Sequence, residues 1–165
     1  MNAHRRILLI DDNRAIHEDF RKILAPADAA KFDEIEAILF GEPAKIVRPI
    51  QCEIDSAYQG AEGVQLVQQA LAAGRPYAMA FVDMRMPPGL DGVETTGKIW
   101  EVDPEVQIVI CTAYADYSWD EMFAKLGNSD GLVILKKPFD TVEALQLVNA
   151  LTEKWWLHQQ LRRKT

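Results

Sequence analysis

The sequence predicts an α/β protein built on a doubly wound, five-stranded parallel sheet. Short apolar runs of strand length recur along the chain, and stretches with apolar residues at helical spacing separate them. Such alternation is typical of a parallel sheet with helices on both faces. The chain has 165 residues, 48% hydrophobic and 26% charged, which suits one domain with a proper core and excludes a mainly disordered chain.

The strands are predicted from their apolar patterns. The first, residues 7–10, is a continuous apolar run bounded by charge, as expected of a strand buried on both faces. The second, 51–57, alternates, with Glu53 and Asp55 between less polar residues. The other three predicted strands cover residues 77–82, 106–111 and 132–135.

A helix is predicted after each strand. Apolar residues at helical spacing place these helices at 13–24, 60–73, 93–100, 119–126 and from 141 onward. Pro26 closes the first helix and Gly74 ends the second. The last is the longest, and Asp140 with Glu143 resembles a capping box at its start.

Residues 25–50 do not fit this regular pattern. A connection between a helix and a strand usually takes about 2–6 residues. Residues 32–40 have the apolar spacing of a further helix, and Gly41 and Pro43 follow as breakers. The segment is either a surface elaboration that packs on the domain or a docking element for a partner. We therefore expect one domain over residues 1–151 with an insertion at 25–50, and a helical extension or linker over 152–165.

The overall charge and the cysteines narrow the class of protein. A net charge of -7 and a pI near 5.0 argue against direct nucleic-acid binding and an anionic membrane surface. No apolar run approaches the ~20 residues of a membrane span, and the N-terminus does not read as a secretory signal. Cys52 and Cys111 have no metal-ligand spacing, which suits a reducing compartment. A cytoplasmic protein is expected.

Acidic residues follow two of the predicted strands. Asp11 and Asp12 come directly after residues 7–10, and Asp83 follows 77–82. In an open α/β sheet, ligands bind outside the carboxyl ends of the strands, so the three carboxylates would share one small site. They repel one another unless a cation lies among their oxygens. A hard, oxygen-seeking ion such as Mg²⁺ is the expected cofactor.

Other strand ends supply complementary groups. Asp83 opens a loop with two prolines and two glycines, which would hold its carboxylate exposed and oriented, as a nucleophile that forms an aspartyl-phosphate requires. Thr112 at the fourth strand offers a hydroxyl, and Lys137 after the fifth offers a positive charge. Taken singly, Asp83 would be a turn cap, Asp12 a helix N-cap and Lys137 a surface lysine. Together they predict a phosphoryl site.

With these residues in view, the chain resembles a response-regulator receiver domain (CheY-like) of two-component signal transduction. The motifs that carry the resemblance are Leu8-Leu9-Ile10-Asp11-Asp12, Val82-Asp83-Met84-Arg85-Met86-Pro87, Asp91-Gly92, Thr112-Ala113 and Lys137-Pro138-Phe139. The resemblance implies the flavodoxin-like strand order and a three-layer sandwich.

The resemblance also implies a role for each site residue. Asp83 would accept a phosphoryl group from a phosphohistidine on a sensor histidine kinase or a histidine phosphotransfer protein. Asp11, Asp12, Asp83 and the backbone carbonyl of Arg85 would bind the metal. Thr112 would be the switch hydroxyl and Lys137 the phosphate-contacting lysine, with Lys136 the weaker choice. Such a domain is a phosphoacceptor switch, not an enzyme acting on other substrates.

The chain departs from the family pattern in three places. Ile134 stands where the family has an aromatic switch residue, so no ring can swing inward there. Pro87-Pro88-Gly89 carries one residue more than is common, and the 25–50 insertion is not a general family feature. The family result that residues two past the acceptor and two past the threonine tune hydrolysis points to Arg85 and Tyr114. Because both are bulky, we expect slow loss of phosphate.

Some alternatives stay open. Trp155 and Trp156 are adjacent, and Leu157 and Leu161 add apolar content beyond what a compact domain needs. The final helix is either frayed at its end, or a signalling helix that pairs in a homodimer or leads into an output domain. Three interpretations of the chain remain: a stand-alone receiver, the receiver portion of a larger hybrid kinase or cyclic-di-nucleotide signalling protein, or a pseudo-receiver acting only in protein contacts. A Mg²⁺-dependent phosphatase would need a second acid where Arg85 stands.

Overall fold

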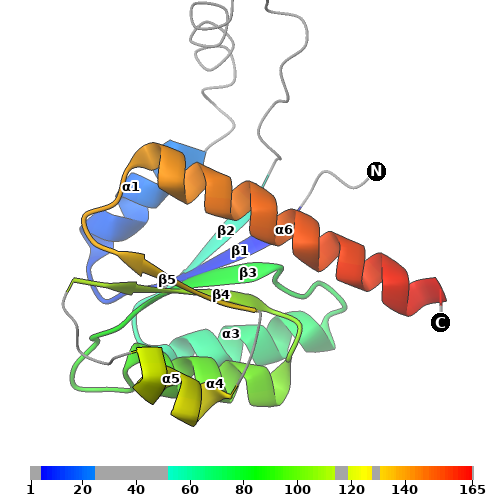
Figure 1. Cartoon of the computed structure of the whole chain (residues 1–165), viewed down its shortest axis with the longest axis horizontal. Coiled ribbons are helices and arrows are strands. Elements are labelled where there is room, and N and C mark those ends of the chain that lie inside the picture. Colours follow the sequence, from blue (N-terminus) through cyan, green and yellow to red (C-terminus); the bar gives the residue numbers. More distant parts are fainter. Residues whose placement is uncertain (1–4, 25–51, 114–118, 128–130, 165) are drawn as a thin grey trace, which may run out of the picture.

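The computed structural model describes residues 5–24, 52–113, 119–127 and 131–164 (Figure 1). Its strands are β1 (Arg5–Ile10), β2 (Cys52–Ala57), β3 (Met79–Asp83), β4 (Gln107–Thr112) and β5 (Leu132–Lys136). Its helices are α1 (Arg14–Leu24), α3 (Gly60–Ala72), α4 (Gly92–Val102), α5 (Trp119–Leu126) and α6 (Thr141–Lys164). Every strand and helix predicted outside 25–50 is present, with ends shifted by a few residues. The helix predicted within 25–50 lies outside the described residues.

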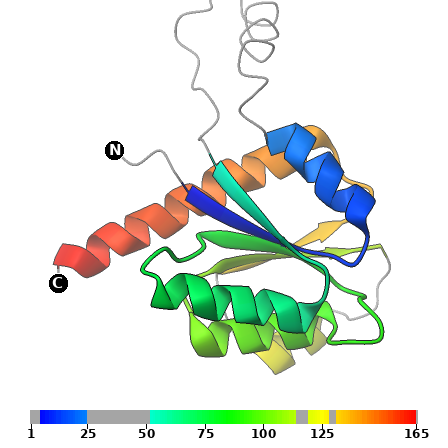
Figure 2. The same cartoon turned by 180° about the vertical axis from the view of Figure 1, so that it is seen from behind.

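The five strands form one parallel sheet in the order β2-β1-β3-β4-β5. Helices α1 and α6 cover one face, and α3, α4 and α5 cover the other, as the two opposite views show (Figures 1 and 2). This is the predicted doubly wound, three-layer arrangement with flavodoxin-like strand order.

Strand β1 shows why its apolar run is continuous. Leu8 and Ile10 point into the core under α3, α4 and α5, whereas Ile7 and Leu9 point into the core under α1 and α6. All four side chains are at most 2% exposed, because successive strand residues face opposite sides of a sheet covered on both.

The described residues on either side of the insertion lie at the edge of the sheet away from the acidic residues. The insertion follows the end of α1 at Leu24 and leads into β2 at Cys52, which pairs with Arg5 at the start of β1. Parallel strands begin at one edge and end at the other, so Cys52 lies at the opposite edge from Asp11. Whether residues 25–50 pack on the domain or dock a partner stays a prediction.

Helix α6 is a single helix of 24 residues. Its first half packs on the sheet through Ala144, Val148 and Leu151. Beyond them, the Arg5 guanidinium donates to the Thr152 hydroxyl at 3.2 Å and to Glu153 at 3.3 Å. Within the parts of the chain that the structure describes, no helix is both long and apolar enough to cross a bilayer.

Candidate functional site

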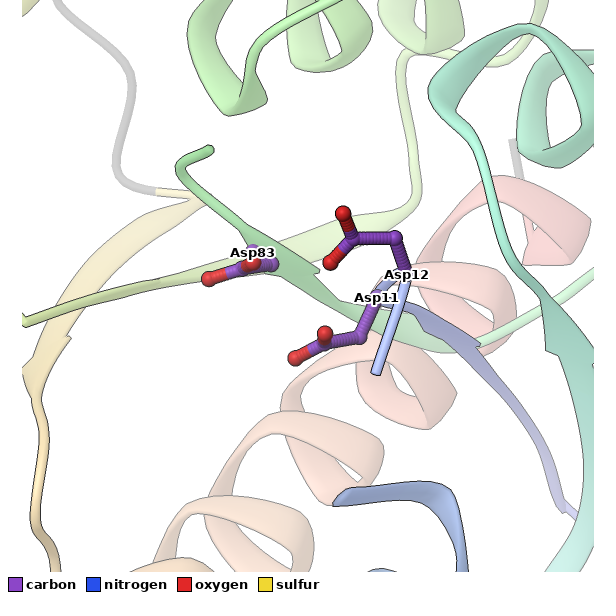
Figure 3. Close-up of side chains that lie close together, drawn as sticks. All are labelled: Asp11, Asp12 and Asp83. Carbon is purple, nitrogen blue, oxygen red and sulfur yellow. The ribbon is translucent and has the colours of Figure 1, made fainter. Parts of the chain in front are cut away.

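The strand register brings the acidic residues together. Ile10 pairs with Val82, so Asp11 follows β1 at the level where Asp83 ends β3. Asp11, Asp12 and Asp83 each offer a carboxylate oxygen, and these oxygens lie within 4.8 Å of one another (Figure 3). The predicted juxtaposition of the three side chains is therefore present.

The neighbouring residues Asp11, Asp12 and Asn13 have different roles at the start of α1. The Asn13 side chain accepts a hydrogen bond from the Ala15 amide at 3.0 Å, which makes Asn13 the N-cap of the helix. The alternative that Asp12 is only a helix cap therefore does not hold. Asp12 is exposed beside the buried Asp11, whose Oδ1 accepts from the Asn13 amide at 2.9 Å. Both carboxylates lie in the acidic cluster.

Lys137 carries its ammonium group to the cluster. Its Nζ lies 3.0 Å from Asp83 Oδ1 and 3.4 Å from Asp11 Oδ2. Its backbone amide donates to the Thr112 carbonyl at 2.8 Å, which anchors the segment after β5 to the end of β4. Lys136 is exposed and ends β5, so Lys137 is the lysine that meets the acidic residues.

The charges in this cluster are unbalanced. Burial, and then the nearby charge of Asp11, raise the pKa of Asp83 although the hydrogen bond from Lys137 opposes the shift. Burial would lower the pKa of Lys137, but its bond to Asp83 and the charges of Asp11 and Asp83 outweigh this and raise it. A single ammonium group thus does not compensate the negative charge gathered at these strand ends.

This imbalance predicts a stability change in Asp83→Asn. The folded chain holds the Asp83 proton more tightly than the unfolded chain, so unfolding free energy falls as pH rises from the ordinary aspartate pKa of 3.8 through the raised one. We expect Asp83→Asn to unfold at a higher urea concentration than wild type at neutral pH in chelator. The difference should shrink as pH falls toward the ordinary value.

The pKa of Asp103 is also raised, by burial, so only the difference between wild type and variant isolates Asp83. Asp91→Asn is the matched control, because Asn can keep the N-cap of α4. A wild type more stable than Asp83→Asn at neutral pH would contradict the expectation.

The loop after Asp83 is closed by its own hydrogen bonds. The Gly89 amide donates to the Met86 carbonyl at 3.0 Å, and the Gly92 amide donates to the Met84 carbonyl at 2.9 Å. A Cβ on Gly92 would lie 2.8 Å from the Asp83 carbonyl oxygen, so only glycine lets α4 begin this close to the end of β3.

Asp91 caps helix α4 in a complete capping box with Glu94. The motif Asp91-Gly92 therefore fixes the backbone around Asp83.

Thr112 and Arg85 lie at the same edge of the sheet without joining the carboxylate cluster. Thr112 is buried at the end of β4, one position beyond Cys111, the strand partner of Asp83. The Arg85 side chain is exposed in the loop. Ile134 lies on β5 and packs, partly buried, against the core under α3, α4 and α5. Tyr114 is outside the described residues, so the expectation of slow phosphate loss stays a prediction.

The sequence interpretation missed His17. This side chain is buried on α1, and its Nε2 lies 2.7 Å from the Asp11 carbonyl oxygen. A histidine in the buried stripe with Phe20 and Leu24, five residues after Asp12, was the available signal. It identifies a buried polar group that needs partners, but not which partners.

A groove opens beside the cluster and was also not predicted. It has a volume of about 770 Å³ and lies between α1 and the segments that follow β4 and β5. Ile16, Phe20 and Ile23 line it from α1, and Pro138 and Phe139 line it from the other side. Lys137 also lines it, so the groove adjoins the charged site.

Comparison with known proteins identifies the class that this fold and site define. The family model described as the response regulator receiver domain matches residues 43–149, from the end of the insertion into α6. The chain belongs to the response regulator receiver family. The match omits β1 and the acidic pair after it, and the structure supplies both: β1 lies between β2 and β3, where the fold requires a strand.

Individual proteins agree with this assignment. The chain is 29% identical to the photosynthetic apparatus regulatory protein RegA of Cereibacter sphaeroides over 153 residues, which cover 93% of this chain and 66% of RegA. It spans less than two thirds of the length of the curated relatives it matches.

Two solved structures show the same fold. The signal receiver domain of an HD domain-containing protein from Pseudomonas fluorescens Pf-5 superposes with a TM-score of 0.68 at 18% identity, covering 97% of this chain and 95% of that one. The response regulator protein TrrA from Thermotoga maritima, in complex with Mg²⁺ and BeF, gives a TM-score of 0.57 at 24% identity, covering 89% and 98%.

Proposed function

We propose that this receiver domain accepts a phosphoryl group on Asp83 from a phosphohistidine, in a reaction that requires Mg²⁺. The observation that carries the proposal is the meeting of three carboxylates and Lys137 at the carboxyl ends of β1, β3 and β5. A structural ion pair would need one carboxylate for the lysine. The additional carboxylates form a site whose excess negative charge favours a bound cation.

The residues present fit Mg²⁺. This ion prefers oxygen ligands, usually one or two carboxylates together with water and phosphate oxygens. Asp11, Asp12 and Asp83 would hold it, with the Arg85 backbone carbonyl as a further ligand. The solved structure of TrrA, which has the same fold, is a complex with Mg²⁺ and BeF, and this supports Mg²⁺ as the ion. When bound, the ion would neutralise charge on the transferring phosphoryl group.

The chain's own residues would then position the reactants. An Asp83 oxygen attacks the phosphorus atom, the bond from phosphorus to the histidine nitrogen breaks, and the departing imidazole keeps the electron pair. Lys137 contacts Asp83 before transfer and would pair with a phosphoryl oxygen afterwards. Thr112 would donate its hydroxyl to another phosphoryl oxygen. These contacts exist only with phosphate bound, so they would bias the domain toward its output state.

Incubation with acetyl phosphate tests the proposal. With Mg²⁺, intact-mass analysis should show one phosphoryl group per chain, and excess chelator should prevent its formation. The adduct should be released by hydroxylamine, as expected of an acyl phosphate. No adduct on wild type would favour the pseudo-receiver. Steady turnover of a phosphomonoester would instead indicate a phosphatase.

The groove beside Lys137 is the proposed contact surface for the phosphohistidine donor. It is mainly apolar, and it adjoins the acceptor, where a donor side chain must arrive. We expect Ile16→Gln to slow transfer from a phosphorylated histidine phosphotransfer protein about tenfold, because the variant puts a polar amide at an apolar contact. Acetyl phosphate needs no docking, so its rate should be unchanged.

Glu18→Gln is the matched control on the same helix, since Glu18 is exposed and does not line the groove. It should transfer at the wild-type rate from both donors. Equal slowing of both donors by Ile16→Gln would indicate damage to the site and contradict the docking role.

Helix α6 is the proposed dimer contact. Leu157 and Leu161 lie one turn apart and are 52% and 64% exposed. We expect the wild-type chain to sediment as a homodimer and Leu157→Glu with Leu161→Glu to sediment as a monomer. Val142→Glu is the control, because Val142 is 62% exposed at the other end of the helix. A monomeric wild type at high concentration would end this proposal and favour a helix end without a pairing role.

A second candidate is the receiver portion of a larger hybrid kinase or cyclic-di-nucleotide signalling protein. The limited coverage of the longer relatives favours it, and so does the similar receiver from an HD domain-containing protein. The chemistry proposed for Asp83 is the same in both cases. In this view α6 and residues 152–165 form a linker to an output module.

A further inference from the structure

We propose that His17 is a positioning residue for the metal site, acting through the peptide bond between Asp11 and Asp12. The inference rests on the proposed function, because it assigns a support to the residues that would bind Mg²⁺. Nε2 of His17 lies 2.7 Å from the Asp11 carbonyl oxygen, in a buried position. A carbonyl oxygen only accepts hydrogen bonds, so the proton must be on Nε2.

A chain of hydrogen bonds on the other side of the ring fits this tautomer. The Arg21 guanidinium donates to the Ser56 hydroxyl oxygen at 2.9 Å, and it can only donate. The Ser56 hydroxyl lies 2.9 Å from Nδ1 of His17, and its proton is available to that nitrogen. With the single ring proton on Nε2, the hydrogen bonds run in one direction, from Arg21 through Ser56 and His17 to the Asp11 carbonyl. Nδ1 of His17 then accepts from the Ser56 hydroxyl.

The bond to the carbonyl orients both acidic residues. The peptide group is planar, so holding the Asp11 carbonyl sets the plane that also contains the Asp12 amide and Cα. The other polar groups of Asp11 are held too: its amide donates to the Ala57 carbonyl at 3.1 Å, and its Oδ1 accepts from Asn13. His17 thus supplies the contact that determines how the exposed Asp12 is presented to the ion.

Tyr58 keeps the imidazole in place from the side. The two ring centroids are 4.5 Å apart, and the Arg14 guanidinium lies 4.1 Å from the Tyr58 centroid. The His17 ring is therefore fixed by packing as well as by hydrogen bonds, as a residue that orients a ligand requires.

Two amide substitutions at His17 test the contacts of Nε2 and Nδ1 separately. The Gln amide reaches the place of Nε2, so His17→Gln can keep the donor to Asp11. The shorter Asn amide reaches only the place of Nδ1, so His17→Asn can keep the contact with Ser56 but not the one with Asp11. Calorimetric titration with Mg²⁺ is the readout, with thermal unfolding in chelator measured beside it to register any general loss of stability.

We expect His17→Asn to weaken Mg²⁺ binding at least about tenfold, the usual scale for residues that support metal ligands. His17→Gln should stay within about threefold of wild type for the same reason. Rescue by Gln and not by Asn is a result that a purely structural role would not produce. Equal affinities in Asn, Gln and wild type, or equal losses in the two variants, would overturn the inference.

Ser56→Ala provides a test if His17→Asn does not fold. Ser56 lies on the edge strand β2 and is partly exposed, and its loss would remove the side-chain partner that holds Nδ1 of His17. We expect a measurable weakening of Mg²⁺ binding, smaller than that of His17→Asn, and wild-type affinity would contradict the proposed chain. A wild-type chain that does not bind Mg²⁺ would refute the proposed function itself. Wild-type binding with unaffected variants would refute only the role of His17.

Discussion

Asp83→Asn is expected to abolish phosphoryl uptake from both acetyl phosphate and a phosphohistidine donor. An amide oxygen is a much poorer nucleophile than a carboxylate, and the substitution changes one atom without changing shape. Removing a covalent nucleophile should leave no adduct within detection, a loss of several orders of magnitude. Intact-mass analysis after incubation with acetyl phosphate and Mg²⁺ measures it directly.

The control for this loss is Asp91→Asn in the loop that follows Asp83. It makes the same chemical change eight residues along the chain, at a residue that caps α4 and lies outside the carboxylate cluster. It should accept phosphate at close to the wild-type rate. An adduct of equal yield on Asp83→Asn would move the acceptor to another residue and end the assignment.

Lys137→Met should change two measured quantities in opposite directions. Lys137 lies 3.0 Å from Asp83 and 3.4 Å from Asp11, so its charge competes with a cation for the same oxygens. Unit charges about 5 Å apart interact by about 3 kcal/mol at an effective dielectric constant near 20. Partial exposure of the lysine and its flexible stem reduce this effect. We expect Mg²⁺ to bind at least about tenfold more tightly to the variant.

Phosphoryl transfer to the same variant should be slower. Lys137 is the cation placed to pair with the transferring group, and loss of one such contact typically costs about 10²–10³ in rate. Titration with Mg²⁺ and the time course of phosphorylation measure the two effects on one sample. Lys136→Met is the matched control, because Lys136 is the exposed neighbour and should leave both quantities unchanged. Weaker Mg²⁺ binding in Lys137→Met would contradict the proposed competition.

The sequence was sufficient for the fold and for the meeting of the acidic residues, for a physical reason. Parallel strands all end at one edge, so residues directly after the apolar runs, such as Asp11 and Asp83, must lie near one another once the order of strands is known. The period of the pattern also identified each helix. The ends of the strands and helices were harder to predict. Strand β1, for example, begins at Arg5, two residues before the predicted strand, because the pairing of Arg5 with Cys52 extends the ladder.

What the sequence did not reveal depends on contacts between distant segments. The partners of His17 come from β2 and from the backbone of Asp11, and no local pattern specifies them. Asn13 and not Asp12 caps α1 because the helix begins at Arg14, and the sequence pattern does not fix the first residue of a helix so closely. The groove beside Lys137 exists only because Ile16 and Phe139 belong to elements that fold against the same face.

The length of α6 has a mechanical consequence. Its 24 residues span about 36 Å, and it begins four residues after Lys137. Near its far end Arg162 lies 3.7 Å from Glu105, beside the start of β4. If the shift of Lys137 from carboxylate to phosphate tilts this rod by ~5°, its far end moves by ~3 Å, enough to break the contact with Glu105. Helix α6 would then act as a lever that converts an atomic displacement at the phosphate into a movement large enough for a partner to detect.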